Sequence, residues 1–104
     1  MERIEKLLQF LSQSPSDNFL QHALALEYIK HGKLNEAKET FEALLNRDES
    51  YIGSYYHLAK LLEQLNQRDE AIKWYEKGLS KAREAADRHA YNELQAAYEE
   101  IMDQ

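Results

Sequence analysis

Apolar residues recur along most of the chain at spacings of three and four, with charged and polar residues between them. This period places the apolar side chains on one face of an α-helix. It predicts helices over residues 1–12, 15–31, 34 to about 47, 48–65, 69 to about 81 and 88–102. No stretch shows the strict alternation of a half-buried strand, so the predicted fold class is all-α.

Several of these helices begin or end at residues suited to the purpose. Ser14 with Pro15 precedes the second helix, Asp48 the fourth and Asp87 the last, and Ser and Asp side chains can cap free amide groups. Gly32 follows the second helix and can take the positive φ of a helix end.

The stretch from Leu58 to Tyr75 repeats the stretch from Leu24 to Phe41 at a distance of 34 residues. Both contain a Leu-Ala pair, and both carry a Glu-Ala pair twelve residues later. A fixed period of this size indicates a repeat architecture. A further step of 34 residues from Asp48 reaches Ala82, which cannot cap a helix. We therefore predict a small insertion or an extended helix around residues 84–88.

The two units resemble the tetratricopeptide repeat, a helix–turn–helix of 34 residues. The residues that match are Leu24, Ala25, Tyr28, Gly32, Ala37 and Phe41 in the first unit and Tyr55, Leu58, Ala59, Leu62, Ala71 and Tyr75 in the second. The chain is also similar to small stand-alone tetratricopeptide proteins of bacteria. The resemblance implies one domain over 1–104 that forms a right-handed superhelix. Its parts are a half-repeat helix over 3–13, repeats over 14–47 and 48–81, and a capping helix over 82–104.

By this resemblance, the first helix of each repeat lines a concave face that binds a peptide or a partner segment. The residues expected on that face are Phe19, His22, Leu26, Ile29, Lys30, Tyr51, Tyr56, Lys60 and Glu63, with His89 and Asn92 as further candidates from the last helix. Aromatic side chains beside a lysine suit a short peptide with an apolar anchor and an acidic or C-terminal carboxylate. The alternative is that the aromatic residues only pack one repeat on the next, and we expect this of Tyr55.

Relatives that clamp a C-terminal carboxylate carry Lys and Asn at the places of His22 and Leu26. That clamp is therefore expected to be absent or incomplete in this chain.

Trp74 breaks the pattern, because its repeat equivalents, Lys6 and Thr40, are polar. A lone tryptophan at such a position is either covered by another element or left as an interaction patch. Tyr98 and the last helix must bury their apolar stripe nearby, so we favour cover by the last helix.

Composition excludes several classes of function. The chain has no cysteine, which excludes disulfides and thiolate chemistry, and its four histidines do not have zinc-ligand spacing. None of the common nucleotide-binding or hydrolase motifs is present. We expect no enzyme, no cofactor and no metal.

Charge and hydropathy limit the kinds of partner that we expect. The net charge is −6, and residues 84–104 hold six acids and one base. Such an acidic end repels phosphate, so nucleic acid is not expected as a partner. No apolar run reaches the roughly 18 to 20 residues of a membrane span, so we expect no membrane partner and a cytoplasmic location.

The predicted function is a protein–protein interaction module that acts through its concave groove. The alternative is an assembly module that associates through its end helices, because an unpaired half-repeat leaves an apolar edge. For the oligomeric state, we expect a monomer rather than a homo-oligomer.

Overall fold

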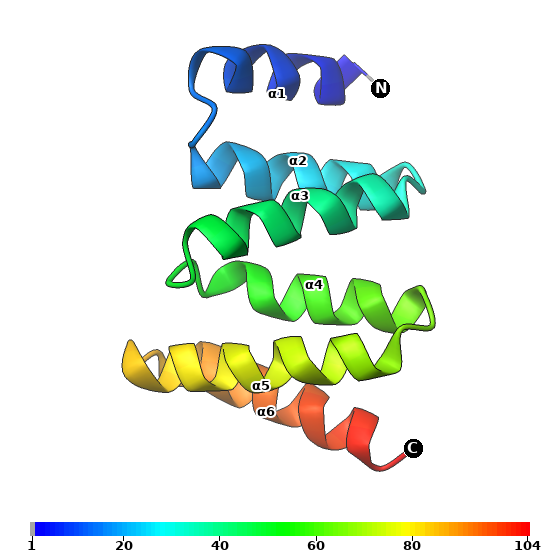
Figure 1. The fold of residues 1–104 in the computed structure, drawn as a ribbon, viewed down its shortest axis with the longest axis vertical. Coiled ribbons are helices and arrows are strands. Elements are labelled where there is room, and N and C mark those ends of the chain that lie inside the picture. Colours follow the sequence, from blue (N-terminus) through cyan, green and yellow to red (C-terminus); the bar gives the residue numbers. More distant parts are fainter. Residues whose placement is uncertain (1) are drawn as a thin grey trace. The chain divides into compact units, whose positions relative to one another are not determined.

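The computed structural model describes residues 2–104, which form six α-helices and no strand. The all-α class and the array of helical hairpins are confirmed (Figure 1). The chain divides into two compact units, Met1–Arg47 and Asp48–Gln104. The right-handed superhelix stays a prediction. None of the helices within residues 2–104 combines the length and the apolarity that crossing a bilayer requires.

Unit 1 contains α1 (Glu2–Gln13), α2 (Asn18–Lys30) and α3 (Leu34–Arg47). Helix α2 packs against both of the others. The small side chains of Ala25 and Ala37 are fully buried, as expected where two helices approach closely. The contact between α1 and α2 is an apolar cluster that consists of Ile4, Leu7, Leu11, Leu20, Ala23, Leu24 and Tyr28.

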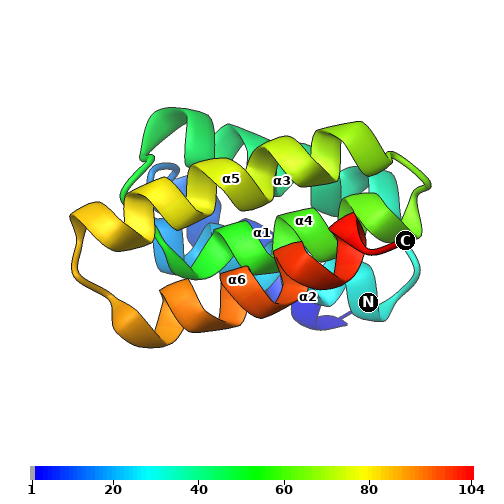
Figure 2. The same cartoon turned by 90° about the horizontal axis from the view of Figure 1, so that it is seen from below.

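Unit 2 contains α4 (Gly53–Gln64), α5 (Arg68–Glu84) and α6 (Arg88–Met102). Each of the three helices contacts the other two, and in Figure 2 α4 is seen between α5 and α6. The buried apolar side chains of this unit are Tyr55, Leu58, Ala59, Leu61, Leu62, Ala71, Tyr75, Ala82, Leu94, Ala97 and Ile101. The repeat-matching residues thus form the core, and the packing role predicted for Tyr55 is confirmed.

Three tight turns inside the units share one geometry. Each has a central residue with positive φ, at Gly32 (75°), Asn66 (61°) and Ala86 (55°). The residue after it donates its N–H to the carbonyl five positions earlier, at 2.8 to 2.9 Å. This is the Schellman pattern, and it confirms the helix end predicted at Gly32. The α5–α6 hairpin therefore closes in the same way as the hairpins α2–α3 and α4–α5.

Ala86 is the costly member of this set, because a Cβ disfavours the left-handed region. We expect Ala86→Gly to raise the free energy of unfolding by about 0.5–1 kcal/mol, since the folded strain relieved exceeds the extra entropy of the unfolded chain. Chemical denaturation of the two proteins measures this difference. Gly32→Ala makes the reverse substitution at the equivalent position of another turn and should lower the free energy of unfolding. An Ala86→Gly protein no more stable than the parent would show that the turn is unstrained.

The start of α2 differs from the prediction. The helix begins at Asn18, and the cap is Asp17, whose Oδ1 accepts the Leu20 N–H at 3.0 Å. Ser14 instead accepts the Asp17 N–H through its carbonyl at 3.1 Å. The chain therefore makes a turn at Pro15 before the helix begins, and the prediction of Ser14 as the cap is wrong.

The start of α4 also differs. Asp48 was expected at the N-cap, but its Oδ1 accepts from the Ser50 N–H at 3.0 Å and from the Ser50 hydroxyl at 2.6 Å. This local turn occupies the carboxylate, and α4 begins five residues later at Gly53. The residue before it, Ile52, makes no side-chain cap.

The end of the chain follows the prediction more closely. Helix α5 continues to Glu84, which confirms an extended helix in this region. Helix α6 covers residues 88–102, and Asp87 accepts the Ala90 N–H at 3.0 Å, so the predicted cap is confirmed.

Trp74 is half-buried, but the prediction of its cover is wrong. Its ring lies 6.0 Å from the Tyr55 ring of α4, and Lys77 of α5 places its Nζ 5.5 Å from the Trp74 ring. Glu76, two residues further along α5, accepts the Tyr98 hydroxyl of α6 at 2.8 Å. Two residues are about 200° apart around a helix, so Trp74 lies on the side of α5 away from this α6 contact.

Candidate functional site

The predicted residues of unit 1 all lie on α2, but they differ in exposure and in surroundings. Phe19 is 71% exposed, Leu26 and Ile29 are half-buried, and Lys30 is exposed. His22 is also half-buried, and its ring meets that of Phe41 edge-on at 5.6 Å. Phe19 and Leu26 are about two helical turns apart and so point in the same direction. The sequence therefore gives α2 apolar side chains on a face that its own unit leaves exposed.

Lys30 has different neighbours from Phe19. It lies at the other end of α2 and lines a cavity of about 420 Å³ between α1 and α2. The other lining residues are Glu2, Arg3, Lys6, Glu27 and His31. Glu27 is buried there, with Oε1 3.4 Å from Nε of Arg3, and its Oε2 has no hydrogen-bond partner among residues 2–104.

The predicted residues of unit 2 lie on the outward face of α4. The Lys60 ammonium is 5.9 Å from the centroid of the Tyr56 ring and 3.8 Å from Oε2 of Glu63. His57, beside Tyr56, meets its ring edge-on at 5.7 Å, and burial lowers the pKa of this imidazole. Tyr51 lies outside the helix, in the turn before α4. The structure thus brings together Tyr56, Lys60 and Glu63, and leaves Tyr51 in a separate element.

Glu63 has a structural partner that the sequence did not indicate. It accepts a hydrogen bond from the hydroxyl of Tyr75, whose ring is fully buried between α4 and α5. Burial raises the pKa of Tyr75, and the hydrogen bond to Glu63 raises it further. Glu63 is therefore held by the core, and through its ion pair it restrains the Lys60 ammonium on the surface.

Two buried tyrosines make the folding stability of unit 2 depend on pH in the alkaline range. Burial raises the pKa of Tyr55 from 10 to about 12, and the pKa of Tyr75 is also raised. The unfolded chain therefore loses these protons first, so the stability they add is complete below pH 10. The part contributed by Tyr55 is lost as pH rises from 10 to 12, and the loss of the Tyr75 part begins in the same range. We expect phenolate absorbance from both residues to appear together with the loss of helical circular dichroism. Phenolate formation at both residues while the helices persist would contradict this.

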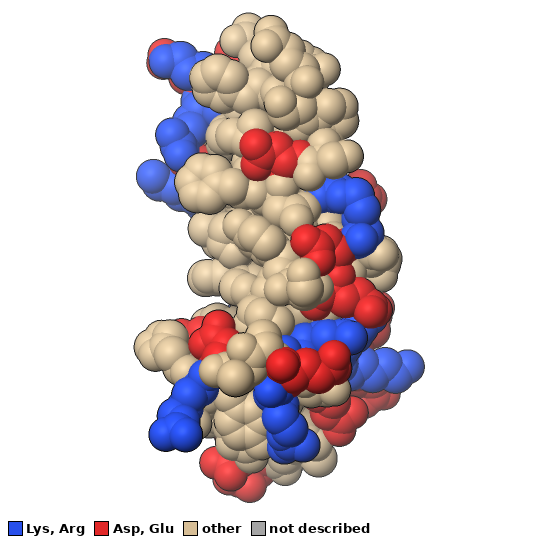
Figure 3. Space-filling model, turned by 90° about the vertical axis from the view of Figure 1, so that its left-hand side faces the viewer, with Lys and Arg blue, Asp and Glu red and all other residues tan. Residues whose placement is uncertain are grey.

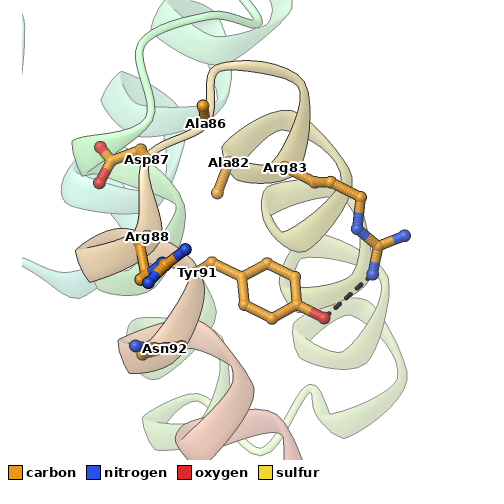
Figure 4. Close-up of a pocket in the computed structure, with 7 residues that line it drawn as sticks. All are labelled: Ala82, Arg83, Ala86, Asp87, Arg88, Tyr91 and Asn92. Atoms are coloured by element: carbon orange, nitrogen blue, oxygen red, sulfur yellow. Dashed lines mark hydrogen bonds between the residues drawn. The ribbon is translucent and has the colours of Figure 1, made fainter.

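One further cavity lies at the turn between α5 and α6, with a volume of about 320 Å³ (Figure 4). It is lined by Ala82, Arg83, Ala86, Asp87, Arg88, Tyr91 and Asn92. Of these residues, only Asn92 was a candidate for partner binding, whereas Ala82 and Asp87 entered the prediction only through helix capping. A signal was present, because two of the five arginines of the chain flank the Ala86-Asp87 turn. Their placement around one cavity depends on the left-handed turn at Ala86, which no spacing rule predicts for alanine.

Within residues 2–104, no three His, Asp or Glu side chains are placed to hold a metal ion together.

Comparison with known proteins agrees with this architecture. A family model described as anaphase-promoting complex, cyclosome, subunit 3 matches residues 1–78. No match was found among curated proteins. The solution structure of a tetratricopeptide repeat domain protein from Salinibacter ruber shares 41% sequence identity, with a TM-score of 0.80. The match covers 84% of this chain and 88% of that one.

Two more distant structures share the fold over nearly the whole chain. A protein from Bordetella parapertussis has 26% identity and a TM-score of 0.82, with 96% of this chain and 87% of that one covered. The TPR2B domain of yeast Sti1, in its complex with pHsp70, has 15% identity and a TM-score of 0.88. That match covers 97% of this chain and 81% of the yeast chain, and at this identity it shows the fold alone.

Proposed function

The chain belongs to the tetratricopeptide repeat family, and on that premise we propose that it is a protein-binding module with no catalysis of its own. The resemblance expected from the 34-residue period is thereby confirmed. The observation that carries the proposal is the exposed apolar face of α2. By the family resemblance, the first helix of each repeat is the one expected to line the partner-binding face.

Helix α2 is apolar nearly all the way round, with Glu27 and Lys30 as its only charged residues. One side packs on α1 and α3, and the other presents Phe19 with the half-buried Leu26 and Ile29. A helix that is apolar on both sides normally has both sides covered. A partner segment with an apolar side chain would supply the second cover.

The outward face of α4, in unit 2, offers a polar contact of its own. Lys60 stands beside the Tyr56 ring, and Glu63 neutralises it only across 3.8 Å at a half-exposed position. An acidic side chain or a C-terminal carboxylate of a partner would compete well for that ammonium. We therefore propose two contacts, each within one unit: an apolar anchor of a peptide binds at α2 of unit 1, and a peptide carboxylate binds at α4 of unit 2.

The test is the affinity of selected peptides for variants of these two faces. Peptides are selected from a random library on the parent protein, and their binding is measured by fluorescence anisotropy. Phe19→Ala at the α2 face, and Tyr56→Ala and Lys60→Glu at the α4 face, are each expected to weaken binding of the peptides that use that face by about tenfold or more without unfolding the protein. Lys73→Glu makes the same charge change on the exposed side of α5 and should leave binding unchanged. If all three variants bind like the parent, the proposed faces are the wrong place.

A second candidate function is assembly through α1, which the exposure of its apolar side chains favours. Leu8 is 45% and Phe10 is 59% exposed, on either side of the stripe that packs against α2. Light scattering over a concentration series tests it, with Phe10→Ser as the comparison. Association that weakens in the variant would support assembly, whereas a parent protein that stays monomeric at its highest soluble concentration would remove the idea.

A further inference from the structure

The cavity at the α5–α6 turn is built by short side chains beneath longer ones. Ala82, fully buried, and Ala86 leave the space, and the Tyr91 ring forms a wall. Figure 4 shows Arg83 from α5 at the hydroxyl end of Tyr91, with Arg88 of α6 near the other end. The Arg83 guanidinium donates to the Tyr91 hydroxyl at 3.0 Å, and its carbon lies 5.4 Å from the ring centroid. The guanidinium is therefore held in place by a neutral group.

The positive charge at this cavity is not neutralised by the acids around it. Asp87, the one acid in the lining, accepts the Ala90 N–H at 3.0 Å as the cap of α6. In Figure 4 its carboxylate is directed away from the Tyr91 ring. Acidic groups do lie close to basic ones on this end of unit 2 (Figure 3), but they have other partners. Glu84 pairs with Lys81 at 3.5 Å, and Glu49 pairs with Lys77 and Lys81.

From this arrangement, we propose that the cavity between Arg83, Arg88 and Tyr91 binds a carboxylate carried on a short apolar stem, such as the C-terminal residue of a peptide. The planar guanidinium fork matches the two oxygens of a carboxylate. The alanine floor and the Tyr91 ring match an aliphatic side chain, which a simple inorganic anion lacks. A volume of about 320 Å³ admits a group of that size and no folded element.

This site goes beyond the proposed function, because it uses neither the α2 face nor the residues of the α4 face. It also differs from them chemically. There a single lysine shares its charge with Glu63, whereas here two guanidinium groups have no carboxylate partner among the ion pairs of the described residues.

The experiment is a titration of the ¹⁵N-labelled full chain, followed by amide chemical shifts at low ionic strength and pH 7. The probes are N-acetyl-leucine, its neutral amide N-acetyl-leucinamide, and inorganic phosphate. N-acetyl-leucine is expected to shift the amides of residues 82–92 in a saturable way. The neutral amide should not shift them, and phosphate should bind several times more weakly because it leaves the apolar floor uncovered.

Variants separate this site from a general charge effect. Arg83→Gln and Arg88→Gln should each weaken N-acetyl-leucine binding by about tenfold, the usual effect of losing a charged hydrogen bond. Both residues are exposed, so circular dichroism should show an unchanged fold. Lys73→Gln removes one charge from the exposed side of α5, outside the cavity, and should bind like the parent. Equal binding of the neutral amide, phosphate binding as tight as that of N-acetyl-leucine, or an equal loss in Lys73→Gln would overturn the proposal. None of these outcomes bears on peptide binding at Phe19 or Lys60.

Discussion

Replacing Gly78 with alanine is expected to lower the free energy of unfolding by about 2 kcal/mol, the largest effect we predict for a single methyl group in this chain. A Cβ at this position would lie 2.7 Å from Cβ of Tyr55, 3.0 Å from its Cγ and 3.2 Å from Cδ1 of Leu94. Such overpacking costs about 3 kcal/mol at the upper end of its usual range. The gain in helix propensity from glycine to alanine offsets about 1 kcal/mol of it.

The neighbours of Gly78 have little freedom to yield. Tyr55 is fully buried, and its hydroxyl donates to the carbonyl of Glu49 at 2.7 Å, so the ring is fixed at both ends. The atom struck is Cβ, close to the backbone of α4, and only a separation of α4 from α5 would relieve the contact. Leu94, by contrast, can move its methyl group away.

Thermal unfolding measures the effect, with a decrease of the midpoint of about 10 °C expected for a domain of this size. Gly53→Ala is the matched control. It makes the same change at the first residue of α4, where an added Cβ meets nothing within 4 Å. Its midpoint should equal or slightly exceed that of the parent. A Gly78→Ala protein that melts with the control would show that α4 and α5 do not approach closely at Tyr55.

Gly78 also shows what the sequence could not predict. The 34-residue period placed Leu58, Ala59, Ala71 and Tyr75 in the core, and all four are fully buried. Those positions can be recognised because they recur and follow helical spacing. The need for glycine at position 78 depends on the distance between two packed helices. That distance does not appear as a repeated pattern in the sequence.

The local errors have a similar cause. Asp48 and Asp17 are both acceptable caps by residue type, yet one accepts from Ser50 in a local turn and the other caps α2. Competing hydrogen bonds of this kind are decided by the few residues that follow. Helix existence was therefore predicted well, whereas the starts of α2 and α4 were not.

For the candidate site, the sequence could predict only which residues share a face of one helix. Phe19 and Leu26 share the outward face of α2, and Lys60 and Tyr56 that of α4, as helical spacing requires. The hydrogen bond from Tyr75 to Glu63 joins α5 to α4, so spacing along one helix could not indicate it. The arginine-lined cavity depends in turn on Ala86 in a conformation that alanine rarely adopts.

Removing the Tyr75 hydroxyl is expected to cost about 1.5 kcal/mol of unfolding free energy. In Tyr75→Phe the Glu63 carboxylate loses a charge-assisted hydrogen bond, and such bonds contribute about 1.5–3 kcal/mol. The lower end applies because the Glu63 side chain is 23% exposed and water can replace part of the lost donor. Urea denaturation of the variant and the parent measures the change.

Two comparisons decide whether that cost arises from the buried hydrogen bond or from the loss of a hydroxyl alone. Tyr98 donates to Glu76 at 2.8 Å in the same chemical pairing, but at an exposed position. Tyr98→Phe should therefore leave stability unchanged within error, because water replaces the bond. In a Glu63→Leu background, Tyr75→Phe should also be close to neutral, since no buried acceptor then loses its donor. If Tyr75→Phe costs the same with and without Glu63, the two side chains are uncoupled, and the core does not hold the carboxylate that pairs with Lys60.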